Sequence, residues 1–536
     1  MAARIRVIFT YFMKPALRPY FDHIIIIVLA GLCYVLFFHG LGNIGLLGPD
    51  EPRYAAIARE MFLTGDYITP RLYGTPWFEK PVLMYWLAAV GYKLFGINEA
   101  GARFPSALAA SVCVFLVYFC GRRFWDRAIA FIAALILLSS IGFFAFARAA
   151  SMDMPLTMCL TAALVFFLFG YNDQTPRRPL WFYAFYAAMG FGVLAKGPIA
   201  VLLPALSLAG FLGLRGRWDE WRTWYPKGLW ITAAISLPWF VVCTVVNGWQ
   251  FLQVFFINQN IERFTTTIHG HPRPFYFFFP VFLLLTFPWT FLMIPTLRRR
   301  FGKNEHILLW WAAVPFVFFS LSQSKLPGYI LPMAPAIALL FAKELLQPVS
   351  RAYKVAVFIE AGTMAFIGVA FGFYGNTLNV DPHVDGMLIA VVTFVIAAIL
   401  CVMALWLKPV FLAPFNVSAI VALVITATTM VFPRFDRTDT MRPWDLALSA
   451  IVPANQTVFM YKPPRWAEYG LQYYRFNRTR GVFSPEDLVQ VVANERRVLC
   501  ISDDKTLQEL SHVANVDMEV VHTIGNQSAF WVWGTN

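Results

Sequence analysis

Long apolar runs, separated by short charged segments, most limit how this chain can fold. Thirteen of them approach the ~20 residues that a helix needs to cross ~30 Å of hydrocarbon. Only 14% of the residues are charged, whereas a soluble protein carries about 25%. Because backbone polar groups in a membrane must pair within helices, we expect an all-α polytopic membrane protein. The predicted spans are 23–41, 102–120, 128–146, 154–170, 180–194, 199–214, 228–246, 276–297, 306–321, 329–346, 355–373, 387–407 and 412–432.

The distribution of basic residues predicts the orientation of the chain. Lys and Arg collect in short cytoplasmic loops, and with the basic N-terminus inside, every inside loop is basic: 121–127, 171–179, 215–227, 298–303 and 347–354. The stretch 82–95 is short and contains Lys93, so we expect it to lie at the interface. Counting it as a span would place the basic loops outside. Much of the net charge of +13 is therefore an orientation signal, and we expect membrane lipids but no nucleic acid as partners.

The tail, residues 433–536, lacks long apolar runs. Strand patterns at 457–461, 497–501 and 520–524, with helical patterns at 486–494 and 505–511, predict a small α/β domain. An odd number of spans places this domain outside, in the periplasm of a Gram-negative cell. We therefore expect a transmembrane domain, 1–432, whose outer loop 42–101 carries interfacial helices, and a periplasmic domain, 433–536.

Segment 48–81 gathers acids and bases at one membrane exit. Asp50 and Glu51 stand at a predicted helix start, and Arg53 follows. Other outward-facing exits carry further candidates, which are Glu79, Lys80, Asp153, Lys196, Lys325 and Tyr329. Lysines on the outer side oppose the positive-inside rule, and an anionic headgroup is the simplest reason. Lysine binds phosphate as a point charge, and arginine binds it with two hydrogen bonds.

Carboxylates that face a phosphate cradle suit group transfer from a lipid-phosphate carrier. The cations would stabilise negative charge on the departing phosphate. An aspartate would deprotonate an acceptor hydroxyl. An acceptor phosphate is already a nucleophile, and the aspartate would then position groups or stabilise an oxocarbenium-like sugar. The residues leave both routes open.

Seven motifs follow one another in the order GPDEPRYAAIAREM, FEKP, SMDMP, AKGP, NIERF, HPRPFYFFFPV and KLPGYILP. This ordered set resembles the GT-C membrane glycosyltransferases of the protein O-mannosyltransferase type, and within them the ArnT family of bacterial lipid A aminoarabinose transferases. The resemblance implies a GT-C fold in the inner membrane. It also implies an undecaprenyl-phosphate sugar as donor, 4-amino-4-deoxy-L-arabinose as the sugar and lipid A as acceptor.

The resemblance also implies roles for the candidate residues. Asp50 would be the main catalytic acid and Asp153 a second one, while Glu51 is a further candidate from its position beside Asp50. The residues expected to hold the carrier phosphate are Arg53, Lys80, Lys196, Lys325 and Tyr329.

Two departures from the family pattern bear on a metal and on the acceptor. By this resemblance, family members can carry a histidine where this chain has Asn260, and that histidine is similar to one that would help Glu79 to hold a metal. His269 and His271 are the candidates to replace it, so the predicted ligands of a divalent metal, zinc, are Glu79, His269 and His271. No other cofactor is expected. In SMDMP a methionine separates the aspartate from the proline, so the sugar and the acceptor can differ from those of the family.

Each candidate also has a purely structural interpretation. An acid at a helix start can be an N-cap worth ~1 kcal/mol, or can favour the helix dipole. Adjacent Glu and Lys residues can form a surface ion pair that contributes little, and outward-facing Lys and Tyr can be interfacial anchors. The two histidines lack a third ligand at zinc-site spacing, which is typical of a loop pair.

Three other functions remain as alternatives. A transferase with the same donor can act on a protein hydroxyl or a glycan, and would then need a base. A lipid-linked sugar flippase or transporter would move its substrate without forming a glycosidic bond. Spans that are nearly bare of charge argue against it, because transporters usually carry ionisable groups near the bilayer midplane. A sensor would depend on ligand binding by the tail and not on Asp50.

Overall fold

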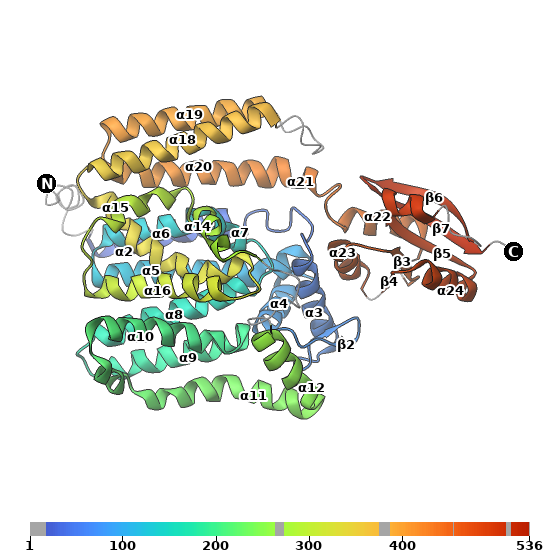
Figure 1. Cartoon of the computed structure of the whole chain (residues 1–536), viewed down its shortest axis with the longest axis horizontal. Coiled ribbons are helices and arrows are strands. Elements are labelled where there is room, and N and C mark those ends of the chain that lie inside the picture. Colours follow the sequence, from blue (N-terminus) through green and yellow to red (C-terminus); the bar gives the residue numbers. More distant parts are fainter. Residues whose placement is uncertain are drawn as a thin grey trace. The chain divides into compact units, whose positions relative to one another are not determined.

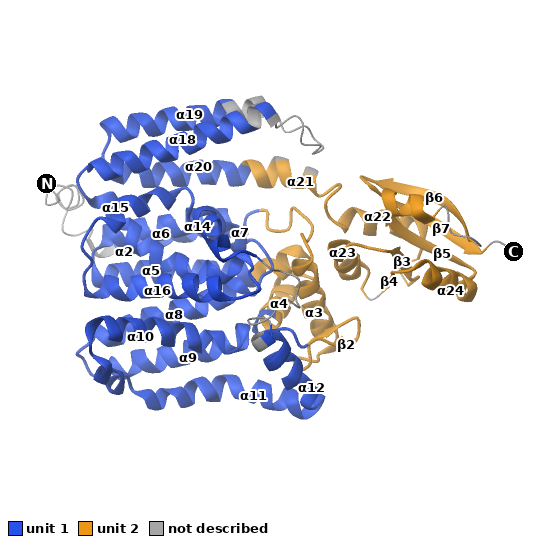
Figure 2. Cartoon of the chain, viewed as in Figure 1, with its two compact units in different colours: residues 1–39, 78–84, 105–425 blue, residues 40–77, 85–104, 426–536 orange. Residues whose placement is uncertain are grey.

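The computed structural model describes residues 18–262, 273–374, 386–453, 455–476, 478–510 and 516–534. Two compact units divide the chain (Figure 2). Unit 1 comprises residues 1–39, 78–84 and 105–425, and unit 2 comprises residues 40–77, 85–104 and 426–536.

Unit 1 is a bundle of helices that lie side by side (Figure 1). Helix α8 packs on α9, α9 on α11, α10 on α16, and α18 on α19. Its α-helices are α2 (Arg18–Cys33), α5 (Glu99–Phe124), α6 (Arg127–Ser139), α7 (Ile141–Ala147), α8 (Asp153–Asn172), α9 (Arg178–Lys196), α10 (Ile199–Arg215), α11 (Leu229–Asn247), α12 (Trp249–Leu252), α14 (Phe278–Thr286), α15 (Met293–Leu297), α16 (Lys303–Leu321), α17 (Ala334–Ala342), α18 (Arg351–Tyr374), α19 (Gly386–Trp406) and α20 (Leu412–Thr426). Shorter 3-10 and π-helices include η2 (Tyr34–Phe38), η3 (Trp218–Trp224), η5 (Gln253–Glu262), η6 (Phe275–Phe277), η7 (Trp289–Leu292) and η8 (Pro327–Met333).

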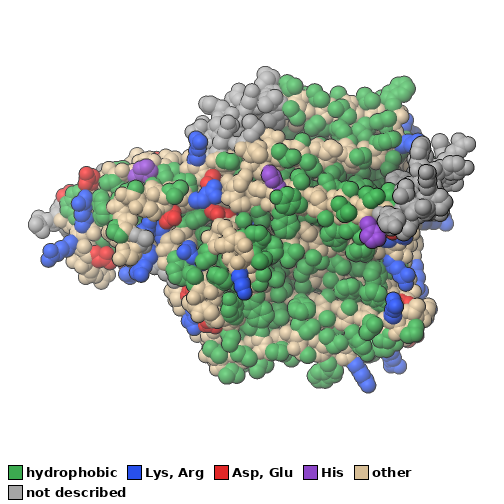
Figure 3. Space-filling model, turned by 180° about the vertical axis from the view of Figure 1, so that it is seen from behind, with side chains coloured by type: hydrophobic (Ala, Val, Ile, Leu, Met, Phe, Trp, Pro, Cys, Tyr) green, Lys and Arg blue, Asp and Glu red, His purple; other side chains and the backbone are tan. Residues whose placement is uncertain are grey.

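The described residues contain eight helices that are long and apolar enough to cross a membrane, or up to ten if each bent pair is one span. The bent pairs are α6 with α7, at 67°, and η6–α14 with η7–α15, at 107°. Helices α9, α10 and α19 coincide with the other predicted spans. Hydrophobic side chains cover most of the visible face of the helical part (Figure 3). The prediction of an all-α polytopic membrane protein is confirmed.

Helix α4 (Leu83–Phe95) is the stretch that the charge pattern excludes as a span. Its 13 residues extend over about 20 Å, less than the hydrocarbon thickness. It belongs mostly to unit 2, together with α3 (Asp50–Thr64) and the small hairpin of β1 (Arg71–Leu72) and β2 (Thr75–Pro76).

The tail contributes a five-stranded mixed sheet to unit 2, in the order β4-β3-β5-β7-β6. Strand β3 pairs in parallel with β4 and β5, whereas β7 is antiparallel to β5 and β6. The tail elements are α21 (Phe432–Phe435), α22 (Arg442–Ile451), β3 (Val458–Tyr461), α23 (Arg465–Arg475), β4 (Thr479–Val482), α24 (Pro485–Glu495), β5 (Arg497–Asp503), α25 (Asp504–Leu510), β6 (Val516–Ile524) and β7 (Gln527–Gly534).

Both faces of this sheet are buried, because successive residues of β3 belong to different cores. Val458 and Met460 pack with Trp444 of α22, whereas Phe459 and Tyr461 pack with helix α24 and strand β7. The predicted α/β character of the tail is confirmed, and the three predicted strands correspond to β3, β5 and β6. Strands β4 and β7 and helices α22 and α23 are additional to the prediction.

Unit 2 joins residues 40–77 and 85–104 to the tail. Gly45 N donates to Asp436 Oδ1 at 2.6 Å, and Tyr474 Oη donates to Glu99 Oε1 at 2.7 Å. Helix α3 also packs on α23. The division at residue 432 into a membrane domain and a tail domain remains a prediction.

Candidate functional site

Asp50 opens helix α3 without capping it. The N-cap residue is Pro49, which makes no side-chain cap hydrogen bond, so the carboxylate of Asp50 is available for another partner. That partner is Arg53, whose Nη2 lies 2.6 Å from Asp50 Oδ1. The Asp50 side chain is 55% exposed, while that of Arg53 is 10% exposed. The pair therefore places an open carboxylate beside a nearly buried cation.

Aromatic rings hold the guanidinium of Arg53. Its Cζ lies 5.1 Å from the centre of the Tyr54 ring, 5.7 Å from that of Trp77 and 5.9 Å from that of Tyr469. Cation–π contacts of this kind orient a guanidinium, and a guanidinium oriented in this way suits binding of a phosphate through its N–H groups. Tyr469 belongs to α23, so the tail contributes one of the rings around Arg53, a candidate phosphate-binding residue.

Glu51 lies in a buried ion pair with Arg103 and is not open to a substrate. Arg103 Nε and Nη2 lie 3.0 and 2.7 Å from the two carboxylate oxygens. Glu51 Oε2 also accepts from Leu47 N at 2.8 Å, and Arg103 donates to the carbonyls of Leu41, Ile44 and Gly45. Both oxygens of Glu51 thus hold the segment that precedes α3.

In unit 1 the structure brings together Asp153, Lys196 and Tyr329. Asp153 starts α8, and its Oδ1 forms an ion pair with Nζ of Lys196 at the end of α9. Lys196 Nζ also lies 4.6 Å from the centre of the Tyr329 ring. Ser151 Oγ completes the environment, because it accepts from Asp153 N at 3.1 Å and lies 3.3 Å from Asp153 Oδ2. Lys196 is therefore held in place by a carboxylate and a ring.

Lys325 stands in the segment between α16 and η8, four residues before Tyr329. It is buried, and its Nζ donates to the carbonyls of Ser322 and of Arg273, the latter at 3.2 Å. Neutral carbonyls do not offset the cost of burying a charge as a carboxylate would. Burial accordingly lowers the pKa of Lys325 below its ordinary value.

Glu79 and Lys80 lie in unit 1 just before α4, and both side chains are half-buried. Asn260 lies in η5, whereas His269 and His271 fall outside the described residues. Among the residues that are described, no three His, Cys, Asp or Glu side chains come together as metal ligands. Of the predicted zinc ligands, the described residues therefore supply Glu79 alone.

Sequence reasoning missed two residues that organise the Asp50 region. Arg103 had a signal, because an arginine within the apolar run 102–120 needs a buried partner. Tyr469 had none, because only the packing of α23 on α3 brings its ring to Arg53.

Comparison with known proteins adds to this geometry. A family model described as dolichyl-phosphate-mannose-protein mannosyltransferase matches residues 79–245. An undecaprenyl phosphate-α-4-amino-4-deoxy-L-arabinose arabinosyl transferase 1 of Pseudomonas fluorescens strain Pf0-1 is 35% identical over 58% of this chain and 56% of its own length. Its counterpart in Pseudomonas fluorescens strain ATCC BAA-477 is 31% identical over 67% of this chain and 66% of its own length. The chain thus aligns with less than two thirds of the length of these relatives.

The similarity in structure covers nearly the whole chain. The crystal structure of ArnT from Cupriavidus metallidurans bound to undecaprenyl phosphate has a TM-score of 0.81 and 25% identity. The match covers 94% of this chain and 97% of that one.

Proposed function

Because the chain is ArnT-like and belongs to the GT-C superfamily, we propose that it is a membrane glycosyltransferase that uses a polyprenyl-phosphate sugar. The proposed donor is undecaprenyl phosphate carrying 4-amino-4-deoxy-L-arabinose, and the proposed acceptor is lipid A. The names of the relatives support this donor, as does the undecaprenyl phosphate in the similar ArnT structure. The chain is a multi-pass membrane protein, and we place its active site and tail on the periplasmic face of the inner membrane.

The Asp50–Arg53 pair is the observation that carries this proposal. Arg53, fixed between rings, would bind the phosphate of the donor, and Asp50 would face the sugar. In the reaction the bond between the anomeric carbon and the carrier phosphate breaks, and that carbon bonds to an acceptor oxygen. The bonding electrons leave with the carrier phosphate, whose charge the cations stabilise.

The role of Asp50 depends on the acceptor. A phosphate oxygen of lipid A is already ionised, so no proton has to be removed and Asp50 would stabilise positive charge on the sugar. A hydroxyl acceptor would instead lose its proton to Asp50 as the new bond forms. Transfer to lipid A phosphate is the route that we propose.

The cluster of unit 1 would serve the departing phosphate. Lys196 and Tyr329 would bind it with Lys80 and Lys325, and Asp153 would keep Lys196 charged and oriented. Glu51 is the weakest of the proposed catalytic acids, because both of its oxygens are engaged with Arg103 and the main chain.

The test is transfer by the full-length protein in vesicles supplied with undecaprenyl-phosphate aminoarabinose and lipid A. We expect modified lipid A with the natural chain, and a loss of at least a hundredfold with Asp50→Asn. Asp219→Asn, an exposed aspartate on η3, is the matched control and should retain activity. Full activity of Asp50→Asn would contradict the role of Asp50, and transport of labelled donor without a new glycosidic bond would favour a flippase.

A further inference from the structure

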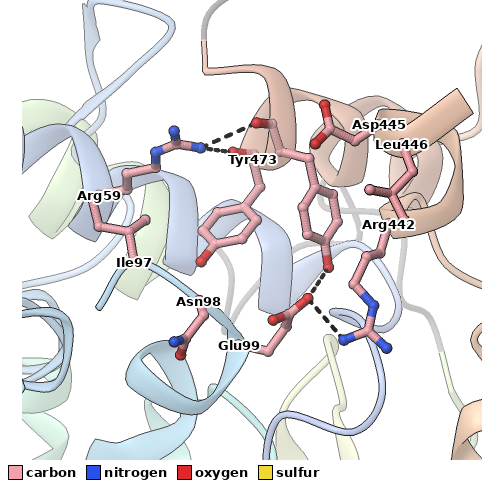
Figure 4. A pocket seen from close by; sticks show the side chains of 9 residues that line it. Arg59, Ile97, Asn98, Glu99, Arg442, Asp445, Leu446 and Tyr473 are labelled. Carbon is pink, nitrogen blue, oxygen red and sulfur yellow. Dashed lines mark hydrogen bonds and ion pairs between the residues drawn. The ribbon is translucent and has the colours of Figure 1, made fainter. Parts of the chain in front are cut away.

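A polar pocket in unit 2 is not used by the proposed chemistry. Its volume is about 310 Å³, within the range of small-molecule sites. Four elements line it, namely α3, the turn from α4 into α5, α22 and α23 (Figure 4). The loop and the tail of the chain therefore share its walls.

Internal hydrogen bonds fix the walls of this pocket. Glu99 accepts from Tyr474 Oη at 2.7 Å and lies 3.5 Å from Arg442 Nη1. Arg442 Nε also donates to Asp436 at 2.6 Å. Arg59 donates to the carbonyls of Tyr473 and Tyr474, which are acceptors in the last turn of α23 (Figure 4). The pocket is thus formed before any ligand arrives.

Among the groups that line the pocket, the carboxylate of Asp445 is the one that we expect to accept hydrogen bonds from a ligand. It lies on α22, its side chain is 32% exposed, and its nearest cation is Arg475 at the long distance of 3.9 Å. Arg59 stands on α3, and it donates to neutral carbonyls of the main chain. The pocket thus offers a carboxylate acceptor on α22 and a guanidinium donor on α3.

The balance of charge selects the class of ligand. The lining contains Arg59 and Arg442 but also Glu99 and Asp445, so a strongly charged ligand of either sign would meet repulsion. A hydroxyl can both donate and accept a hydrogen bond. The two tyrosine side chains and two aliphatic ones supply apolar surface beside these polar groups. A neutral, hydroxyl-rich ligand fits this mixture better than an ion.

We infer that this pocket binds a saccharide unit of the acceptor. The inference rests on the proposed function and extends it to acceptor selection. Arg59 follows Asp50 by nine residues on α3, which places it about 13.5 Å further along the helix. A saccharide bound there is remote from the reacting carbon. Its binding energy would position the acceptor oxygen for attack on that carbon. Asp445 is then a specificity residue and takes no part in bond making.

The experiment measures both binding and transfer with the full-length protein in vesicles. The binding probe is the N-acetylated β(1→6)-linked glucosamine disaccharide, and lipid A is the acceptor for transfer. For Asp445→Asn we expect at least tenfold weaker binding of the disaccharide and a similar rise in the acceptor KM, with a much smaller change in kcat. Ile97→Trp, which fills the pocket without removing a polar group, should do the same. Asp439→Asn, at an exposed position before α22, should leave both values unchanged.

The outcomes separate this inference from the proposed function. Wild-type disaccharide binding by Asp445→Asn and by Ile97→Trp would overturn the inference. A rise in the donor KM in place of the acceptor KM would overturn the assignment to the acceptor. Asp50→Asn should lose transfer yet bind the disaccharide normally. If the natural chain shows no transfer but loses disaccharide binding with Asp445→Asn, the proposed function fails while the saccharide pocket stands.

Discussion

Arg103 and Glu51 form a buried ion pair through two parallel hydrogen bonds, with Nε 3.0 Å from Oε1 and Nη2 2.7 Å from Oε2. The same guanidinium binds three main-chain carbonyls of segment 41–45. Since Asp50 directly precedes Glu51, this pair fixes the backbone on which the candidate catalytic acid stands. We therefore propose different tasks for the two neighbouring acids: Glu51 would fix the backbone, and Asp50 would act on the substrate.

Replacing Glu51 with alanine should destabilise the protein. It would leave Arg103 buried without its carboxylate, and breaking a buried pair in this way costs about 3–5 kcal/mol of unfolding free energy. We expect a clear fall in Tm in detergent. Asp50→Asn is the control. The Asp50 side chain is largely exposed, so loss of its ion pair with Arg53 should leave Tm near the natural value. Glu51→Ala with an unchanged Tm but no transfer would instead assign Glu51 to catalysis.

The membrane helices could be predicted from sequence because a span needs only length and apolar character. The shortness of α4 and the placement of the basic loops both predict from sequence that α4 is not a span. Strands β4 and β7 could not be predicted, because neither sequence shows a clear alternation of apolar and polar residues. The engagement of Glu51 and the ring of Tyr469 could not be predicted, since both depend on which distant segments meet in unit 2.

The role of His269 and His271 stays a prediction, because both lie outside the described residues. In the sequence, the candidate acids and cations are marked by their position at predicted membrane exits. That position predicts a shared side of the bilayer and says nothing about which residues pair. The pairing of Asp153 with Lys196 therefore emerged only from the structure.

Arg53→Lys should lower the transfer rate although it keeps the charge. Lysine cannot form the planar contacts with the rings of Tyr54, Trp77 and Tyr469, or bind phosphate through two hydrogen bonds. Losing about 1–2 kcal/mol of such contacts corresponds to a fall of roughly 5- to 30-fold in kcat/KM for the donor. Arg71→Lys is the matched control, because Arg71 of β1 also pairs with an aspartate, Asp66, at 3.5 Å. Equal rates for Arg53→Lys and the natural chain would argue against a phosphate-binding role.

Asp153 and Lys196 should behave as one unit in a double-mutant cycle. Asp153→Asn and Lys196→Gln each leave one partner without its counter-charge, so each should lower transfer. The double variant should be no worse than the poorer single one, with a coupling of roughly 1.5–3 kcal/mol, as for hydrogen bonds to charged groups. Lys227→Gln, at an exposed position, should show no coupling with Asp153→Asn. Additive losses would mean that the ion pair has no joint role.

Lys325 predicts how transfer depends on pH. Burial lowers its pKa, so the ammonium should lose its proton, and transfer should fall, at a lower pH than for an exposed lysine. Stability should change in the opposite direction. Because the unfolded chain binds more protons between the lowered pKa and the ordinary value, the unfolding free energy rises with pH there. Lys325→Arg, which stays charged, should move the alkaline loss of transfer to higher pH. If transfer by Lys325→Arg fell at the same pH as transfer by the natural chain, Lys325 would have no role in phosphate binding.

Gly328→Ala tests the cluster around Asp153 without changing any charge. A Cβ at this position would collide with the Asp153 carboxyl group and lie 2.9 Å from Phe146 Cε1. Since Asp153 holds Lys196, displacing its carboxylate should disturb both candidate residues and lower transfer by at least tenfold. Gly362→Ala is the control, because a Cβ there meets nothing within 4 Å and alanine favours a helix interior by about 0.5–1 kcal/mol. That control should transfer normally. If Gly328→Ala also transfers normally, the Asp153 carboxylate does not need the position seen in this structure, and its proposed hold on Lys196 fails.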